Sequence, residues 1–184
     1  MLDLQHLHDL LQPIVGEPLS DIYRSVGQVF EFGEQRPDTN KRGEAITRGD
    51  FTLKLIAADW RIVQAGRVIL GSSDRTNNES FFHDDEPSDL PFDAEAWRLG
   101  REFLGSVEEA NLVVEAIEVG PFADVAIQLS NGFKMESFGS SGQDFDLWWF
   151  HNRRTDVSCL VSPSGPYIGK HSEREAPKIQ PHEE

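Results

Sequence analysis

Six histidines are the first candidates for metal chemistry, and none of them is placed to share a metal ion. His6 and His8 lie two residues apart on a predicted helix, where side chains at that spacing point in different directions. Residues 83–86 offer a histidine and three acids, but consecutive residues in a proline-flanked loop seldom converge on one ion. We therefore predict no metal site and no cofactor.

Nucleophilic side chains give no stronger signal. Cys159, the only cysteine, lies in the apolar run 157–161, where a buried structural side chain is expected. The serines in 71–74 and 139–142 lack the flanking residues of a nucleophile elbow. The sequence also contains no phosphate-binding loop and no dinucleotide fingerprint. No catalytic residue is predicted. With 32 acidic residues in the chain, the sequence does not exclude a pair of carboxylates that performs acid–base chemistry.

Acidic residues are concentrated in the second half of the chain. The 184 residues include 17 basic and 32 acidic side chains, which give a formal net charge of −15. Residues 79–152 hold 16 acids and 3 bases, and seven acids but no base lie between Glu79 and Glu95. This charge argues against binding to nucleic acid or to an anionic membrane. The acidic segment either keeps the surface solvated or recruits a basic protein partner.

Two aromatic residues interrupt the acidic segment. Phe81 and Phe82, surrounded by acids, have the pattern of an apolar contact inside a charged rim, although packing against a nearby helix explains them equally well. If this segment binds a partner, the expected contact residues are Phe82, Asp84, Asp85, Glu86 and Asp89.

These side chains must be positioned by two predicted helices and a series of strands. Leucine spacing predicts a short amphipathic helix over 3–11, and Asp93 can cap a second helix over 93–104, which breaks near a glycine. Alternating apolar residues predict antiparallel strands within 22–70 and 112–151. The polar segment 34–49 is expected to form a long mobile hairpin loop.

One hairpin can be predicted in register. A two-residue turn at 131–132 would place the apolar side chains of its two strands on opposite faces. A three-residue loop over 130–132 needs Gly132 in the left-handed region. That loop pairs Ile127 with Met135, so that both apolar sets are buried together. We therefore predict the three-residue loop.

Two parts of the chain show a similar order of strands. Residues 14–74 and 108–152 each contain a strand, a hairpin and a Trp-bearing strand, by duplication or by coincidence. The expected fold class is α+β, with mostly antiparallel strands in two similar halves and one helix between them. We expect a single domain over 1–161 and a disordered tail over 162–184. A pocket between the halves would be lined by Ser72, Asp74, Ser140 and Ser141.

Several short motifs carry a resemblance to a group of proteins. These are Asp-Trp-Arg-Ile at 59–62, Gly-Ser-Ser-Asp at 71–74 and the run 124–132, which is followed by Met135 and Phe138 ahead of a Trp strand. In these three motifs the chain resembles a group of small uncharacterised bacterial proteins. Members of that group look like stand-alone cytoplasmic domains, and some are similar to immunity proteins that accompany secreted toxins. The resemblance covers about residues 14–152, carries over no catalytic residue and implies a protein-binding function.

Two functional expectations from different classes follow. The first is a non-enzymatic protein-binding domain, an immunity-type inhibitor whose acidic surface covers the active site of a basic toxin such as a nuclease. The second is a small-ligand-binding or enzymatic domain with its site between the two halves. The sequence shows no signal-peptide pattern and no apolar run of transmembrane length, and its single cysteine is typical of a reducing compartment. A cytoplasmic location is expected.

Overall fold

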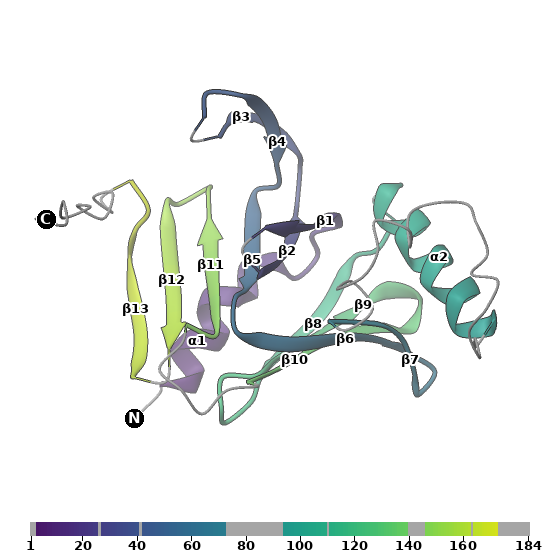
Figure 1. Ribbon diagram of the computed structural model, residues 1–184. Coiled ribbons are helices and arrows are strands. Elements are labelled where there is room, and N and C mark those ends of the chain that lie inside the picture. Colours follow the sequence, from purple (N-terminus) through teal and green to yellow (C-terminus); the bar gives the residue numbers. More distant parts are fainter. Residues whose placement is uncertain are drawn as a thin grey trace, which may run out of the picture.

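Figure 1 shows the computed structural model, which consists of two antiparallel sheets, a two-stranded arm and two helices. The structure describes residues 3–25, 27–40, 42–72, 94–109, 111–139, 146–162 and 164–172, with the backbone alone at 25 and 94–98. Every strand pair in this part of the chain is antiparallel, which confirms the predicted mostly antiparallel α+β class. Within the described residues, neither helix has the length and apolarity needed to cross a membrane.

The larger sheet has six strands in the order β1-β2-β5-β11-β12-β13. Its central strands are buried because apolar and aromatic side chains fill them, as in β5 and β11. The six strands are β1 (Leu19–Ser25), β2 (Gly27–Phe32), β5 (Phe51–Leu55), β11 (Trp148–Asn152), β12 (Val157–Ser162) and β13 (Gly165–Lys170).

The smaller sheet has five strands in the order β7-β6-β10-β9-β8. Its strands β9 and β10 alternate between buried and half-buried residues, so one face lies on the core and the other faces outward. The five strands are β6 (Ala58–Gln64), β7 (Arg67–Gly71), β8 (Val114–Val119), β9 (Val125–Leu129) and β10 (Phe133–Gly139).

Two helices cover the core, and each packs against a strand that is distant from it in the sequence. Helix α1 (Leu4–Leu11) is capped by Asp3 and buries Leu7 and Leu11, and it packs beside β8. Helix α2 (Ala94–Glu108) packs beside β1 and β7. It continues beyond the predicted end near Gly105, because Val107 in the following turn is buried and outweighs the low helix propensity of glycine.

The two sheets share one core. Phe30 of β2 meets Trp60 of β6 edge to face, with ring centroids 5.6 Å apart. Trp148 of β11 donates its indole N–H to the Ala123 carbonyl at 2.8 Å and so joins the larger sheet to the turn before β9. Helix α2 contributes Phe103, whose ring centroid lies 5.2 Å from that of Phe133.

The predicted register of the 125–139 hairpin is confirmed. Ile127 pairs with Met135, and both side chains are buried. The intervening residues form the short 3-10 segment η3 (Ser130–Gly132), in which Gly132 has a φ of +74°. Asn131 also lies in the left-handed region, with a φ of 62°, which asparagine tolerates better than most residues.

Two sequence expectations about irregular segments are wrong. Much of the loop predicted over 34–49 is a paired arm, formed by β3 (Arg36–Thr39) and β4 (Ala45–Arg48), which projects from the larger sheet in Figure 1. Asn40 closes its turn by accepting hydrogen bonds from the backbone of Arg42 and Glu44. The disordered tail expected over 162–184 is in its first part a strand, β13, which pairs with β12 along its length, and residues 173–184 lie outside the described residues.

The halves do not pack as two separate units. The first half places β1, β2 and β5 in the larger sheet and then crosses with β6 and β7 into the smaller one. The second half places β8, β9 and β10 in the smaller sheet and β11 in the larger one, where β12 and β13 follow it. Each sheet is therefore completed by strands of the other half.

Candidate ligand pocket

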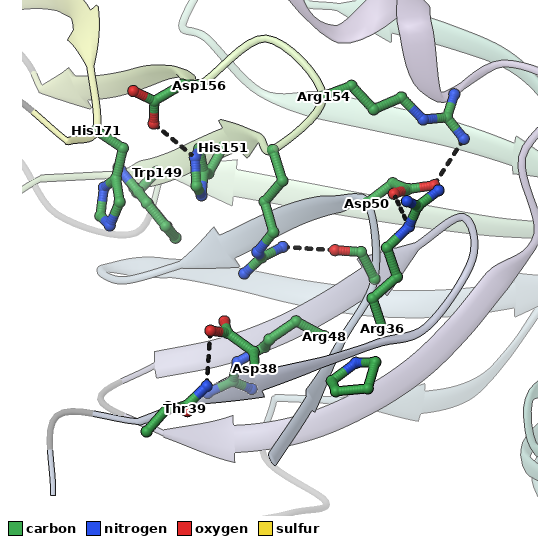
Figure 2. A pocket seen from close by; sticks show the side chains of 13 residues that line it. Arg36, Asp38, Thr39, Arg48, Asp50, Trp149, His151, Arg154, Asp156 and His171 are labelled. Atoms are coloured by element: carbon green, nitrogen blue, oxygen red, sulfur yellow. Dashed lines mark hydrogen bonds and ion pairs between the residues drawn. The ribbon is translucent and has the colours of Figure 1, made fainter. Parts of the chain in front are cut away.

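A pocket of about 570 Å³ opens at one end of the larger sheet (Figure 2). Strand β3 and the end of β4 form one wall, and β11 with the turn into β12 forms the other. His171, which directly follows β13, completes the lining. Arginine, histidine, aspartate and tryptophan side chains dominate its surface, in contrast to the acidic character of the chain as a whole.

Two buried carboxylates each pair with two arginines beside this pocket. Glu31, 1% exposed, lies 3.6 Å from Arg48 and 3.3 Å from Arg153. Asp50, 3% exposed, lies 3.0 Å from Arg36 and 2.7 Å from Arg154. Because the partners come from β2, the arm and the β11–β12 turn, these pairs fix the arm against the sheet.

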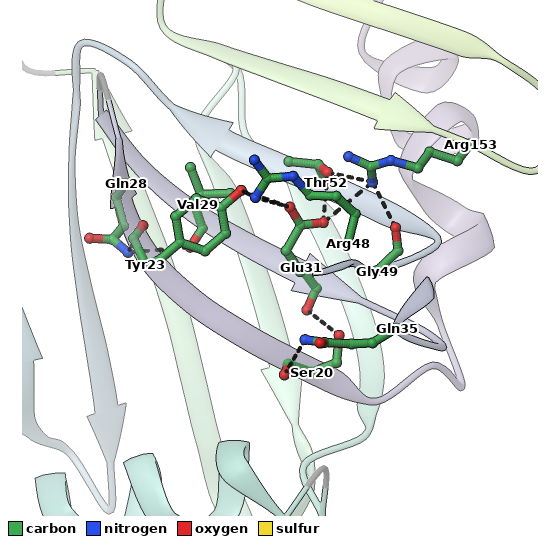
Figure 3. A network of polar contacts seen from close by, with 10 residues as sticks. All are labelled: Ser20, Tyr23, Gln28, Val29, Glu31, Gln35, Arg48, Gly49, Thr52 and Arg153. Carbon is green, nitrogen blue, oxygen red and sulfur yellow. Dashed lines mark hydrogen bonds and ion pairs between the residues drawn. The ribbon is translucent and has the colours of Figure 1, made fainter. Parts of the chain in front are cut away.

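The Glu31 carboxylate is the centre of a larger polar network (Figure 3). It accepts hydrogen bonds from Tyr23 Oη at 2.9 Å and from Thr52 Oγ1 at 2.7 Å, while Arg153 also donates to the Gly49 carbonyl at 2.7 Å. Burial raises the pKa of Glu31, and the nearby Arg153 guanidinium opposes that rise. The pKa of Tyr23 is raised by burial and by the adjacent Glu31 carboxylate. The network orients the arginines rather than leaving them free in solvent.

Three rings form the opposite side of the pocket. The His151 and His171 rings are tilted against each other with centroids 4.4 Å apart, and the Trp149 ring lies 5.5 Å from each of them. Trp149 and His151 are two residues apart on β11, so they share the face opposite to the buried Trp148. Asp156 holds the β11–β12 turn to the chain after β13 by accepting hydrogen bonds from Ser172.

Two polar atoms of this ring cluster are buried without a hydrogen-bond partner among the described residues, Trp149 Nε1 and His151 Nε2. His151 is 6% exposed, and its Nε2 lies 3.7 Å from Asp156 Oδ1, which is longer than a hydrogen bond. Burial, with Arg153 and His171 nearby, lowers the pKa of His151 to about 4. The imidazole is therefore neutral at pH 7.

The chemistry of the pocket suits binding better than proton transfer. A general acid or base works best with a pKa near the operating pH. The pKa of His151 lies well below neutrality. The hydrogen bonds from Ser172 lower the pKa of Asp156, which takes that pKa further from neutrality as well. The pocket instead offers groups that recognise a ligand, namely oriented guanidinium groups, an indole N–H and neighbouring aromatic rings.

Most site residues predicted from the sequence lie outside the described residues. This holds for Phe82, Asp84, Asp85, Glu86 and Asp89, and for the pocket candidates Asp74, Ser140 and Ser141. Ser72 is described, and its hydroxyl donates to Asp59 at 2.9 Å. It lines a separate pocket of about 120 Å³ between β1, β2, β5 and β6, which shares no lining residue with the larger pocket.

The arginine–histidine pocket was not predicted, although the sequence contains traces of it. Alternation along β11 places Trp149 and His151 on one face, and two consecutive arginines follow that strand. The arm residues could not be assigned to the site while 34–49 was expected to be a loop. Cys159 is fully buried in β12, as its apolar neighbours predict.

No family model, no curated protein and no solved structure matches this chain. The resemblance to toxin-immunity proteins stays a sequence-based expectation, and the function has to be argued from the site.

Proposed function

We propose that the protein is a non-catalytic binding domain that takes up a small ligand in the pocket between the β3–β4 arm and β11. The observation that carries this proposal is a pair of buried ring nitrogens, Trp149 Nε1 and His151 Nε2, which have no hydrogen-bond partner among the described residues and belong to side chains that line a pocket of about 570 Å³. That volume lies within the range typical of small-molecule sites, roughly 300–1,000 Å³.

The two unpartnered atoms are costly in the absence of a ligand. A buried polar group without a partner loses about 1–3 kcal/mol relative to one that is satisfied. Such groups are rare in folded proteins, and a ligand that hydrogen bonds to both atoms would recover much of that cost. The surrounding ion pairs hold the pocket open around them, because they join the arm to the sheet at Glu31 and Asp50.

The proposal can be tested by screening a library of small fragments against the isotopically labelled protein by NMR. Hits should shift the amide resonances of β3, β11 and the β11–β12 turn. The double variant Trp149→Phe/His151→Phe should lose at least tenfold in affinity for them. Gln64→Leu is the matched control, because Gln64 Oε1 is also buried and unpartnered but lies in the smaller sheet. Hits that bind the double variant and the wild type equally would overturn the proposal.

A second candidate function is recognition of a basic protein, in line with the immunity-type expectation. The supporting observation is Phe122, which is 75% exposed in the turn between β8 and β9. Glu118 and Asp124 lie on either side of it in the chain and line a shallow pocket of about 280 Å³ together with Glu136 and the ion-pair partner of Glu136, Arg61. An exposed aromatic residue among acids is the arrangement of an apolar contact with a charged rim.

This second candidate predicts distinct effects on binding kinetics. Neutralising Asp84, Asp85 and Glu86 together should slow association with a basic partner and reduce its salt dependence. Phe122→Ser should instead speed dissociation by an amount that salt hardly changes. Tyr167→Ser, at a 60% exposed aromatic residue on β13, is the control. A triple variant that captures the same partner at the same rate would show that the acidic segment only solvates the surface.

We also propose that the two halves arose by duplication of one helix-plus-strands unit. The order α1-β1-β2-β5-β6-β7 in the first half corresponds to α2-β8-β9-β10-β11-β12 in the second. In both, three strands enter one sheet and the next two enter the other. The helices also correspond, since α1 lies by β8 and α2 by β1. The arm β3–β4 would then be an insertion in the first copy, and it supplies one wall of the pocket.

A further inference from the structure

We infer that the ligand of this pocket is a small organic oxyanion that carries a planar ring. The inference rests on the proposed function and specifies the chemistry of its ligand. It is based on the distribution of charge among the four arginines and on the three aromatic rings that line the same pocket.

The arginines of the two buried clusters are not equally neutralised. Arg36 and Arg154 share Asp50, and each has a second acidic partner further out, Glu34 and Glu17. Their cluster therefore contains more acids than bases.

The other cluster has the opposite balance. Arg48 and Arg153 share the single carboxylate of Glu31, so at least one positive charge there has no acidic partner among the described residues. Both arginines are only about a quarter exposed, at 27% and 26%, so solvent screens this charge incompletely.

The same two arginines have donor groups without a partner among the described residues. The hydrogen bonds and ion pairs described for Arg48 and Arg153 all use Nη1. A guanidinium group has five N–H donors, and its planar edge matches the two oxygens of a carboxylate or phosphate. Asp38 and Asp156 also line the pocket and stay negatively charged, but their described hydrogen bonds come from Thr39 and Ser172, and neither forms a described ion pair with Arg48 or Arg153.

A planar ring has a complementary surface on the wall across the opening from the arm. Trp149, His151 and His171 present aromatic faces to one another at 4.4–5.5 Å, and they are tilted rather than parallel. His151 is neutral at pH 7, so its Nε2 adds a hydrogen-bonding group to this wall without adding charge. Figure 2 shows Arg36 and Arg48 of the arm across the opening from Trp149 and His171, whereas Arg153 follows β11 and belongs to the same wall as the rings. A ligand that contacts both the rings and the arginines needs a flat part and an anionic part.

The test is isothermal titration calorimetry at low ionic strength with four probes, namely phenyl phosphate, inorganic phosphate, benzamide and benzylamine. Phenyl phosphate should bind at least tenfold more tightly than inorganic phosphate, which lacks the ring, and than benzamide, which lacks the charge. Benzylamine, an aromatic cation, should not bind. Raising the salt concentration from about 50 to 500 mM should weaken the binding of phenyl phosphate severalfold, because the attraction is electrostatic.

Variants connect the result to the pocket. Arg48→Gln and Trp149→Leu should each reduce the affinity for phenyl phosphate at least tenfold. Arg61→Gln should not, since Arg61 is an exposed, ion-paired arginine in the smaller sheet. Arg48 also supports the fold, so Arg48→Lys, which keeps the charge but not the guanidinium edge, provides the second measurement and should give an intermediate loss.

The outcomes separate the two proposals. Pocket resonances that shift with benzamide or benzylamine but not with phenyl phosphate would overturn the oxyanion inference and leave the proposed function standing. Phenyl phosphate binding that Arg61→Gln and Arg48→Gln weaken equally would overturn the inference as well, because the site would then lie elsewhere. If neither these probes nor the fragments perturb the pocket, both proposals are wrong.

Discussion

At the residue scale, the pocket depends on polar side chains that are buried with several partners each. Glu31 receives hydrogen bonds from Tyr23 and Thr52 and pairs with Arg48 and Arg153. Removing one member of such a set costs more than the set contributes as a whole, because the remaining charges stay buried without compensation. The individual side chains therefore control both the stability of the fold and the shape of the site.

The first prediction concerns this carboxylate. Glu31→Gln removes the charge between Arg48 and Arg153 and should lower the free energy of unfolding by on the order of 2 kcal/mol or more. Glu136→Gln is the control, because Glu136 forms its ion pairs at the surface with Arg61 and Lys134, and it should cost less than about 1 kcal/mol. Urea unfolding measures both, and equal effects of the two substitutions would contradict this account of Glu31.

The second prediction follows from the pKa of His151, which is lowered from 6.5 in its ordinary state to about 4 in the folded protein. Between these two pH values the unfolded chain binds the proton more tightly than the folded one. Stability should therefore fall as the pH drops from about 6.5 towards 4, by at most roughly 3 kcal/mol from this group. Above pH 6.5 the contribution is constant.

NMR titration of the imidazole and urea unfolding at pH 7 and pH 5 test this sign. The stability difference between the two pH values should shrink in His151→Phe and persist in His6→Gln, since His6 is exposed on α1. An imidazole of His151 that titrates near pH 6.5 would show that it is not buried as a neutral group.

At the element scale, local pattern predicted the strands and failed at two short hairpins whose residues show no apolar alternation. The 130–132 loop could be predicted because alternation on both sides allows only one register with a single apolar face. The arm β3–β4 and the strand β13 could not, because their residues are polar or rich in glycine and proline. Those segments are paired to neighbours, and pairing is not encoded in their own composition.

The candidate site was missed for the same reason. Its residues come from β3, β4, β11, the β11–β12 turn and the chain after β13, which meet only when the arm and the last strand are in place. The acidic segment 79–95 dominated the sequence because its charge is local. The arginine-rich pocket cannot be seen there, since Arg36 and Arg48 lie more than a hundred residues before Arg153 and Arg154 and each of the four pairs with an acid.

The third prediction compares two glycines in different elements. Gly132 has a φ of +74°, so Gly132→Ala should destabilise the protein by about 1 kcal/mol or more, even though a Cβ there meets no other atom. Gly105 lies in helix α2, and a Cβ at that position also meets nothing. Gly105→Ala should therefore stabilise by about 0.5–1 kcal/mol. Opposite shifts of the melting temperature are expected, and a shift of the same sign in both variants would contradict the backbone argument.

At the scale of the whole molecule, the exchange of strands makes the two halves dependent on each other. Strand β10 is paired along its length with β6, and β11 is paired along its length with β5. Helix α1 covers β8, and helix α2 covers β1. Either half by itself would keep a three-stranded sheet, but the strand that pairs with the other half, β5 or β10, would have an unpaired edge. Either half would also lack the helix that the other half supplies. Folding of the chain should therefore be a single cooperative transition.

The last prediction tests this dependence by dividing the chain within the polar segment 75–91. Fragments 1–78 and 92–184, produced separately, should each lack the dispersed amide spectrum of a folded protein, because each lacks the strands that complete its sheet and core. Mixing them should restore the spectrum of the intact chain, since the missing pairings β5–β11 and β6–β10 can form between fragments as they do within one chain. The complex should bind the ligand of the intact protein, because the arm comes from the first fragment and β11 from the second. A well-dispersed spectrum from fragment 1–78 alone would show that the first half folds without strands of the second, and the shared sheets would then not explain the cooperativity of the fold.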